Sequence, residues 1–167
     1  MGPSGFLPPA DQLVGTTTPS SVICKWDGAI NHASHSAGGV VVMNPAGEVL
    51  RAKGVQFVGV DEPLVAEMLT LHEAVLWCIA SGFTEVQFEG DDKVIIDKFN
   101  HADIRDSRIG ALLEEVLHCL SNHSGFSVRF VGRRSNRVAH LVARKTLLLY
   151  PTTSRVFDFL AWLNSRM

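Results

Sequence analysis

The chain has 167 residues, of which 46% are hydrophobic and 19% are charged, and its formal net charge is −2. These values suit one domain with a full core, and they exclude a strongly basic protein that coats nucleic acid nonspecifically. No apolar run approaches the roughly 20 residues of a membrane-spanning helix, so we expect no membrane partner. The three cysteines lie far apart and form no CxxC pair, which indicates a reducing compartment, in the nucleus or the cytoplasm.

The N-terminal part of the chain predicts a linker followed by three strands. Residues 1–21 are rich in Pro, Gly, Ser and Thr and lack the basic start and apolar core of a signal peptide, so we expect a disordered linker there. Residues 22–27 (VICKWD) have strand character. Residues 38–43 and 48–58 follow as strands on either side of an Asn-Pro-Ala-Gly turn. These three strands predict an antiparallel meander.

Helices and strands alternate in the rest of the chain. Pro63 opens a long helix with an apolar stripe, and Gly82 closes it. The later elements are a strand over 84–89, helices over 91–99 and 109–120, a strand over 126–131, a helix over 136–149 and an amphipathic segment over 154–163. This order predicts an α/β fold in which helices flank a mixed five-stranded sheet, because helical crossovers permit parallel pairing of the first, fourth and fifth strands.

The domain organisation follows from the same order of elements. We expect one domain over residues 22–150. Residues 151–167 are expected to form a C-terminal helix that packs on this domain or extends it. Phe157, Leu160 and Trp162 would line one side of that helix, where they could contact a protein partner or the chain's own sheet. The sequence gives no indication of the oligomeric state.

Three acidic residues lie in three different predicted elements. Asp27 ends the first strand, Glu67 lies on the apolar face of the long helix, and Asp91 follows the fourth strand. Each has an ordinary explanation. Asp27 precedes a glycine at a turn, and Glu67 could reach solvent from the edge of the apolar stripe or pair with a base such as Lys25. Asp91 or its neighbour Asp92 could cap a helix.

The predicted sheet nevertheless places the first and fourth strands side by side, with the long helix packed across them. The three carboxylates would then converge and repel one another, unless protons or cations were bound between them. Hard divalent cations such as Mg²⁺ prefer carboxylate and water oxygens, and two such ions can promote phosphodiester cleavage. The joint arrangement therefore predicts a metal site.

Other residues could complete such a site. His140 lies at the start of the last core helix, and its imidazole suits Mn²⁺ better than Mg²⁺. It could equally be a partly buried helix histidine. Paired arginines in the preceding loop could hold phosphates, and paired glycines could admit a nucleic-acid backbone or mark a bulge. The candidate nucleic-acid contacts are Gly28, Gly38, Gly39, Arg133, Arg134 and Asn136.

The motifs occur in an order and spacing that resemble the type 1 ribonuclease H domain. They are WDGA, AGGVVV, NPAGEVL, AEMLTLHEAV, VQFEGDD and NRVAHLVA, and together they cover about residues 22–150. The chain looks most like the ribonuclease H-like domains of plants, many of which are related to retroelements. The resemblance implies strand order 3-2-1-4-5, two divalent ions (Mg²⁺ or Mn²⁺), and cleavage of the RNA strand of RNA–DNA hybrids that leaves 5′-phosphate and 3′-hydroxyl ends.

The resemblance also assigns residues to roles. It implies that Asp27, Glu67 and Asp91 are the first three metal-binding carboxylates. Asp91 is preferred to Asp92 because FEGD aligns with the family's strand-then-ESD pattern. The family expects a fourth carboxylate in N-x-x-A-D, where this chain has His140. Two further family features are absent from the sequence, namely a histidine in the preceding loop and a long basic insertion between the two middle helices.

Two hypotheses follow. In the first, the chain is a metal-dependent endoribonuclease, with Asp27, Glu67 and Asp91 as ligands and His140 as an auxiliary ligand or proton-transfer group. In the second, it is a ribonuclease H-like nucleic-acid-binding or protein-interaction module with weak or no catalysis. The substitution at His140, the missing loop histidine and the net charge of −2 favour the second hypothesis.

Overall fold

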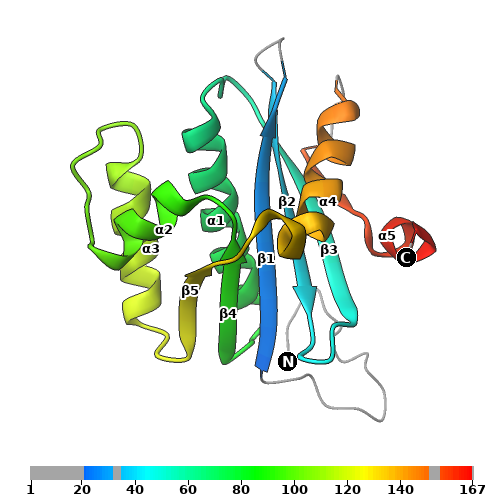
Figure 1. Ribbon diagram of the computed structural model, residues 1–167, viewed down its shortest axis with the longest axis horizontal. Coiled ribbons are helices and arrows are strands. Elements are labelled where there is room, and N and C mark those ends of the chain that lie inside the picture. The colour runs from blue at the N-terminus through cyan, green and yellow to red at the C-terminus, as the bar shows by residue number, and fades with distance from the viewer. Residues whose placement is uncertain (1–20, 32–34, 151–154, 167) are drawn as a thin grey trace.

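A six-stranded sheet forms the centre of the molecule (Figure 1). The structure is a computed structural model that describes residues 21–31, 35–150 and 155–166. The predicted linker therefore lies outside the described residues, apart from Ser21, which begins the first strand. The strands are β1 (Ser21–Ile30), β2 (Ser36–Met43), β3 (Val49–Phe57), β4 (Glu85–Gly90), β5 (Phe126–Phe130) and β6 (Val156–Asp158).

The order of the strands is β5-β4-β1-β2-β3-β6. β1, β2 and β3 are antiparallel neighbours, whereas β4 pairs in parallel with β1 and β5 pairs in parallel with β4. The predicted order 3-2-1-4-5 is confirmed for the first five strands. The predicted count of five is wrong, because β6 adds to the free edge of β3, where Gly54 faces Phe157.

The helices are α1 (Pro63–Ala80), α2 (Lys93–Asn100), α3 (Gly110–Ser121), the short 3-10 helix η2 (Arg133–Asn136), α4 (Arg137–Leu148) and α5 (Leu160–Arg166). Residues 154–163 were predicted as one amphipathic segment, but the described residues of this range are divided between β6 and α5. A strand of three residues is too short to show the alternation of apolar and polar residues that marks strands in a sequence. Its pairing with the edge of β3 is therefore what identifies β6.

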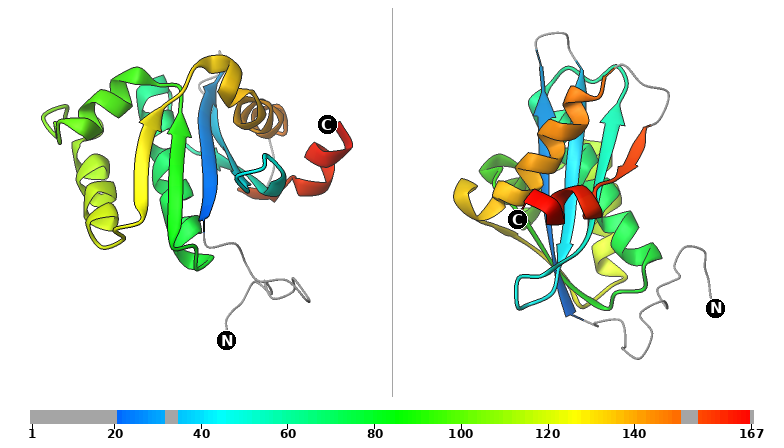
Figure 2. Two further views of the ribbon diagram at one scale, coloured as in Figure 1. Left: turned by 60° about the horizontal axis from the view of Figure 1, so that its bottom comes forward. Right: turned by 90° about the vertical axis from the view of Figure 1, so that its right-hand side faces the viewer.

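The helices cover the two faces of the sheet in two groups (Figure 2). One face of β1 carries Cys24 and Trp26, which pack with the apolar residues of α1, α2 and α3 in the larger core. The other face of the sheet meets α4 and α5. There, Val41 of β2 packs with Val142 of α4 and Leu163 of α5. Side chains alternate across a strand, so neighbouring positions of β1 and β2 face different helices.

α1 is the most apolar helix of the described chain. Met68, Leu71 and Val75 are fully buried against the sheet, which is how the core helix of a globular domain packs. Its 18 residues have a mean hydropathy of 1.4, so by length and composition alone it also passes for a membrane span. The buried stripe explains this composition without a membrane.

The predicted boundaries agree with the structure to within a few residues, with one consequence for the site. β1 was expected to end at Asp27, but it continues to Ile30 because Gly28 to Ile30 remain paired with β2. Asp27 therefore lies inside a strand, opposite Gly39. The turn explanation for Asp27 is wrong.

Candidate functional site

Three carboxylates from β1, α1 and the end of β4 converge at one point. Asp27, Glu67 and Asp91 each offer an oxygen, and these oxygens all lie within 4.8 Å of one another. β1 and β4 are parallel neighbours, so Asp27 and Asp91, near the carboxyl ends of the two strands, lie at the same edge. This group of residues is called the carboxylate cluster below.

Gly28 brings α1 close to β1. A Cβ atom at this position would lie only 3.0 Å from the backbone nitrogen of Glu67 and 3.1 Å from the carbonyl carbon of Ala66, so glycine permits the close approach. The backbone N–H of Gly28 also donates a hydrogen bond of 3.1 Å to Oε1 of Glu67. Gly28 therefore positions a member of the carboxylate cluster. The alternative in which Glu67 pairs with Lys25 is not the arrangement found, since Lys25 bonds to Glu89.

The structure separates the roles of the two adjacent aspartates. Asp92 is the N-cap of α2, and its Oδ1 accepts a hydrogen bond of 3.2 Å from the backbone N–H of Ile95. This is the ordinary capping interaction of an aspartate at a helix start. Asp91 makes no such bond in the described structure and instead joins the carboxylate cluster. The capping explanation thus holds for Asp92 and leaves Asp91 to the site.

Burial changes the acidity of two members of the cluster. Desolvation raises the pKa of Asp27, and the charge of Asp91 adds to this rise, although hydrogen bonds from His140 and Glu67 oppose it. Burial, followed by the charges of Asp27 and Asp92, raises the pKa of Glu67 well above its ordinary value. Buried carboxylates so close together retain protons unless a cation replaces them. The donor set of carboxylate oxygens fits hard divalent cations.

His140 contacts the cluster directly. It lies in the first turn of α4, and its Nδ1 is 2.8 Å from Oδ2 of Asp27, while the side chain is 52% exposed. An ionised carboxylate only accepts hydrogen bonds, so Nδ1 carries the proton in this contact. The Nε2 atom is then the only ring atom left to bind a metal or exchange a proton. The interpretation of His140 as a histidine unrelated to the site does not fit this contact.

Gly38 and Gly39 are both buried in β2, and each faces a helix of the chain itself. A Cβ atom at Gly38 would overlap the side chain of Thr70 on α1, and one at Gly39 would overlap the backbone of α4 at Ala139. The irregularity of the β2–β3 ladder lies at Val42 and Met43, so the glycines mark no bulge. Their missing side chains explain how α1 and α4 approach the sheet closely enough to carry Glu67 and His140.

The candidate contacts before α4 fall into two groups. Arg133 and Arg134 are exposed on η2, as a phosphate-binding pair requires. Asn136 is completely buried, and its Nδ2 donates a hydrogen bond of 2.8 Å to the carbonyl oxygen of Trp26, next to Asp27. Asn136 therefore ties the start of α4 to β1, and the expectation that it contacts nucleic acid does not fit its burial.

An ion-pair network missed by the sequence analysis lies beneath the cluster. Nζ of Lys25 donates to Oε1 of Glu89 at 2.8 Å and to the carbonyl oxygen of Ser135 at 2.7 Å. Arg129 and Gln87 donate to the other oxygen of Glu89. This network ties β1, β4, β5 and η2 together. One signal in the sequence was the spacing Lys25-x-Asp27, which puts both side chains on one face of β1. The same spacing separates Glu89, near the end of β4, from Asp91, just after it.

A family model described as reverse transcriptase-like matches residues 25–146 of the chain. This range includes the carboxylate cluster and His140. Among curated proteins, none matches the sequence.

Solved structures of ribonuclease H1 enzymes superpose on the chain. RNase H1 from the halophilic archaeon Halobacterium salinarum NRC-1 has a TM-score of 0.69 at 22% identity, over 75% of this chain and 96% of that one. The N-terminal RNase H domain of rv2228c from Mycobacterium tuberculosis has a TM-score of 0.68 at 20% identity, over 75% of this chain and 91% of that one. LC11-RNase H1, solved in complex with an RNA/DNA hybrid, has a TM-score of 0.69 at 16% identity, over 76% of this chain and 96% of that one. The chain therefore belongs to the reverse transcriptase-like family, and its domain has the type 1 ribonuclease H fold.

Proposed function

We propose that this chain is a metal-dependent endoribonuclease that cleaves the RNA strand of RNA–DNA hybrids. The observation that carries the proposal is the carboxylate cluster, whose three oxygens lie within 4.8 Å of one another in a ribonuclease H fold. The complex of LC11-RNase H1 with an RNA/DNA hybrid supports the choice of substrate class.

Asp27, Glu67 and Asp91 would hold two divalent ions, Mg²⁺ or Mn²⁺. When bound, the ions supply activation of the attacking water and stabilisation of the leaving oxygen. The protein's own contribution is to fix three carboxylates on a rigid sheet and helix. His140 steadies Asp27 through Nδ1 and presents Nε2 as an auxiliary ligand or a proton-transfer group.

A cleavage assay on a labelled RNA–DNA hybrid tests this function, with Mg²⁺ and Mn²⁺ supplied separately. We expect the parent chain to cut the RNA strand and EDTA to stop the reaction. Asp27→Asn and Asp91→Asn should abolish cleavage, because each removes one anionic ligand. Asp92→Asn is the matched control, since it makes the same chemical change one residue away and asparagine also caps helices. Full cleavage by the Asp27→Asn or Asp91→Asn variant contradicts the metal site.

The second candidate function is a nucleic-acid-binding module without catalysis. It is favoured by His140, which stands where a fourth carboxylate is expected and whose Nδ1 already bonds to Asp27. A neutral imidazole adds no negative charge to attract a second Mg²⁺. Tight binding of the hybrid by the parent chain, without cleavage in either Mg²⁺ or Mn²⁺, would favour this function over the first.

A further inference from the structure

The charges of the chain are divided unevenly along the sequence. Residues 116–157 contain seven of the fifteen basic residues and no acidic residue. The other parts of the chain contain the remaining eight basic residues and all seventeen acidic residues. The net charge of −2 therefore conceals a basic segment, which covers β5, η2 and α4, inside an otherwise acidic protein.

Among the described residues, the exposed arginines of η2 and α4 differ from Arg105, Arg108 and Arg129 in having no acidic partner. Arg105, Arg108 and Arg129 each form an ion pair. In the described part of the chain, no ion pair or hydrogen bond involves the side chains of Arg133, Arg134, Arg137 and Arg144. These four residues are called the arginine ridge below. No described acidic residue neutralises their charges, so they can attract an external polyanion.

The arginine ridge runs beside the carboxylate cluster. At 3.6 residues per turn, Arg137 and Arg144 lie about 60° and about 40° around α4 from His140. His140 in turn touches Asp27, so the cluster borders the same side of the helix. The two arginines are seven residues apart, which is about 10.5 Å along the helix axis and about three nucleotides of a duplex strand at 3.4 Å each.

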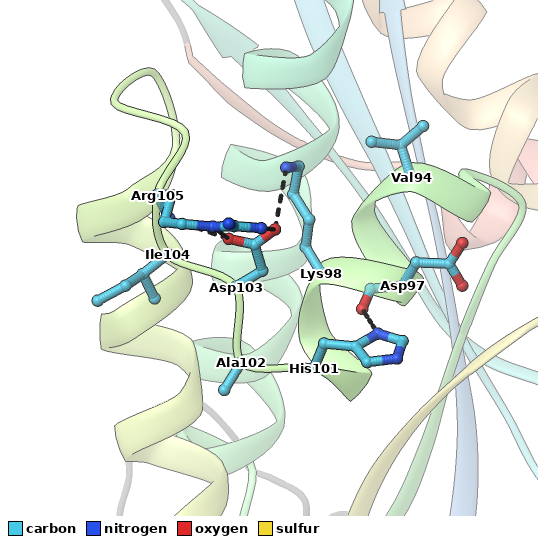
Figure 3. Close-up of a pocket in the computed structure, with 8 residues that line it drawn as sticks. All are labelled: Val94, Asp97, Lys98, His101, Ala102, Asp103, Ile104 and Arg105. Carbon is cyan, nitrogen blue, oxygen red and sulfur yellow. Dashed lines mark hydrogen bonds and ion pairs between the residues drawn. The ribbon is translucent and has the colours of Figure 1, made fainter.

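The connection between α2 and α3 offers a contrast. A hollow of about 600 Å³ lies there, lined by Lys98, Asp103 and Arg105 among others (Figure 3). Arg105 pairs with Asp103 at 2.8 Å, and Lys98 lies 3.9 Å from the same carboxylate. Arg108 pairs with Asp106 at 2.7 Å. The basic groups of this connection are thus neutralised locally and give no comparable attraction for phosphates.

We infer that Arg137 and Arg144 hold the phosphodiester backbone of the RNA–DNA hybrid alongside the carboxylate cluster. The inference rests on the proposed function for the identity of the polyanion. Guanidinium groups bind phosphate oxygens through two parallel hydrogen bonds, and each contact releases counterions from the nucleic acid. The acidic remainder of the chain repels the same polyanion, so the ridge also fixes the side from which the hybrid approaches.

The test is a binding measurement in EDTA, which separates the ridge from metal binding. Fluorescence anisotropy with a labelled hybrid is recorded over a range of salt concentrations. The Arg137→Gln/Arg144→Gln variant should lower the slope of log affinity against log salt by about 2, because each lost phosphate contact lowers it by about 1. Arg105→Gln/Arg108→Gln makes the same change in net charge at paired arginines and should keep the parent's slope.

Three outcomes of the binding measurement overturn the inference. The first is an Arg137→Gln/Arg144→Gln variant that keeps the slope and affinity of the parent, and the second is a control variant that loses as much affinity as this variant does. The third is absence of hybrid binding by the parent chain in EDTA. Cleavage is measured separately. If the parent cuts the hybrid and the Arg137→Gln/Arg144→Gln variant keeps the parent's KM, a role of these two arginines in holding the hybrid is excluded while the proposed function stands. If binding depends on the ridge but no metal supports cleavage, only the proposed function falls.

Discussion

At the scale of single residues, each member of the carboxylate cluster had an ordinary explanation that the structure could test. Asp27 is not in a turn, Glu67 is not paired with Lys25, and Asp92 rather than Asp91 caps α2. What remains is a cluster of three carboxylates, in which desolvation raises the pKa of Asp27 and of Glu67. A protein keeps such a costly arrangement where a ligand compensates for it.

The identity of residue 140 decides which metal the site uses well. His140→Asp adds a carboxylate beside Asp27, so we expect more cleavage with Mg²⁺ and a smaller advantage of Mn²⁺. The measurement is kcat on the hybrid with each ion, for the parent and the variant. His140→Ala is the control, because it removes the imidazole without supplying a ligand. Equal Mg²⁺ activity of the Asp and Ala variants would exclude the fourth-ligand role.

The raised pKa of Glu67 predicts a pH-dependent stability of the metal-free protein. The folded state holds this proton more tightly than the unfolded chain, where the pKa is about 4.3. The associated stability is therefore fully present below about pH 4.3 and is lost as the pH rises through the folded-state pKa. Glu67→Gln cannot ionise, so its advantage over the parent should grow towards neutral pH.

Urea denaturation in EDTA between mildly acidic and neutral pH measures this difference. The comparison of parent and variant at each pH cancels the titration of other groups. If the difference in the free energy of unfolding between the parent and Glu67→Gln stays constant with pH, the raised pKa of Glu67 is refuted. The same variant should lack hybrid cleavage, so the change would stabilise the protein while it removes function, a common trade-off at active sites.

At the scale of elements, β1 is the strand on which the site is built. It carries Asp27 and pairs with β4, the strand that Asp91 follows. Its Lys25 bonds to Glu89 of β4 and to the carbonyl oxygen of Ser135 in η2. Burial alone would raise the pKa of Glu89, but hydrogen bonds from Lys25 and Gln87 hold it below its ordinary value. The network therefore favours the ionised form and locks the strands that hold the aspartates.

Removing Lys25 should destabilise the protein through Glu89. We expect Lys25→Met to lower the free energy of unfolding by about 3 kcal/mol, the lower end for a broken buried pair, because Arg129 still neutralises Glu89. Adding Glu89→Gln should recover part of the loss, since no buried charge then lacks its partner. Chemical denaturation of both variants measures this. A double variant at least as unstable as the single one would show that the pair acts through packing alone.

At the scale of the whole molecule, the C-terminal segment completes the second face of the sheet. α5 lies beside α4 over β3 (Figure 2). Phe159 and Leu163 are buried in the apolar cluster that Val41 and Val142 form on this face, where Phe157 and Trp162 also pack. These residues therefore pack on the chain's own sheet, and the predicted contact with a protein partner stays a prediction. The described part of this segment, residues 155–166, thus supplies both a strand at the edge of β3 and a helix over the sheet.

Leu163 tests how far this segment stabilises the fold. It is fully buried, so Leu163→Ala should cost about 2–5 kcal/mol, the usual range for truncating a buried leucine. Leu148→Ala is the matched control, since Leu148 is 74% exposed and surface changes usually stay within about 0.5 kcal/mol. Thermal and urea denaturation measure both variants. Similar losses in the two would show that α5 contributes no more than a surface residue does.

The sequence by itself determined the first five strands, their order, the main helices and the residues of the carboxylate cluster. It could do so because apolar periodicity, turn residues and the ordered motifs are local properties of the chain. Only the tertiary structure decided that β6 extends the sheet, that Lys25 bonds to Glu89, that Asn136 is buried, and that His140 contacts Asp27. These features depend on contacts between residues far apart in the chain, and no local pattern records which distant partner a strand edge, a charge or an imidazole will meet.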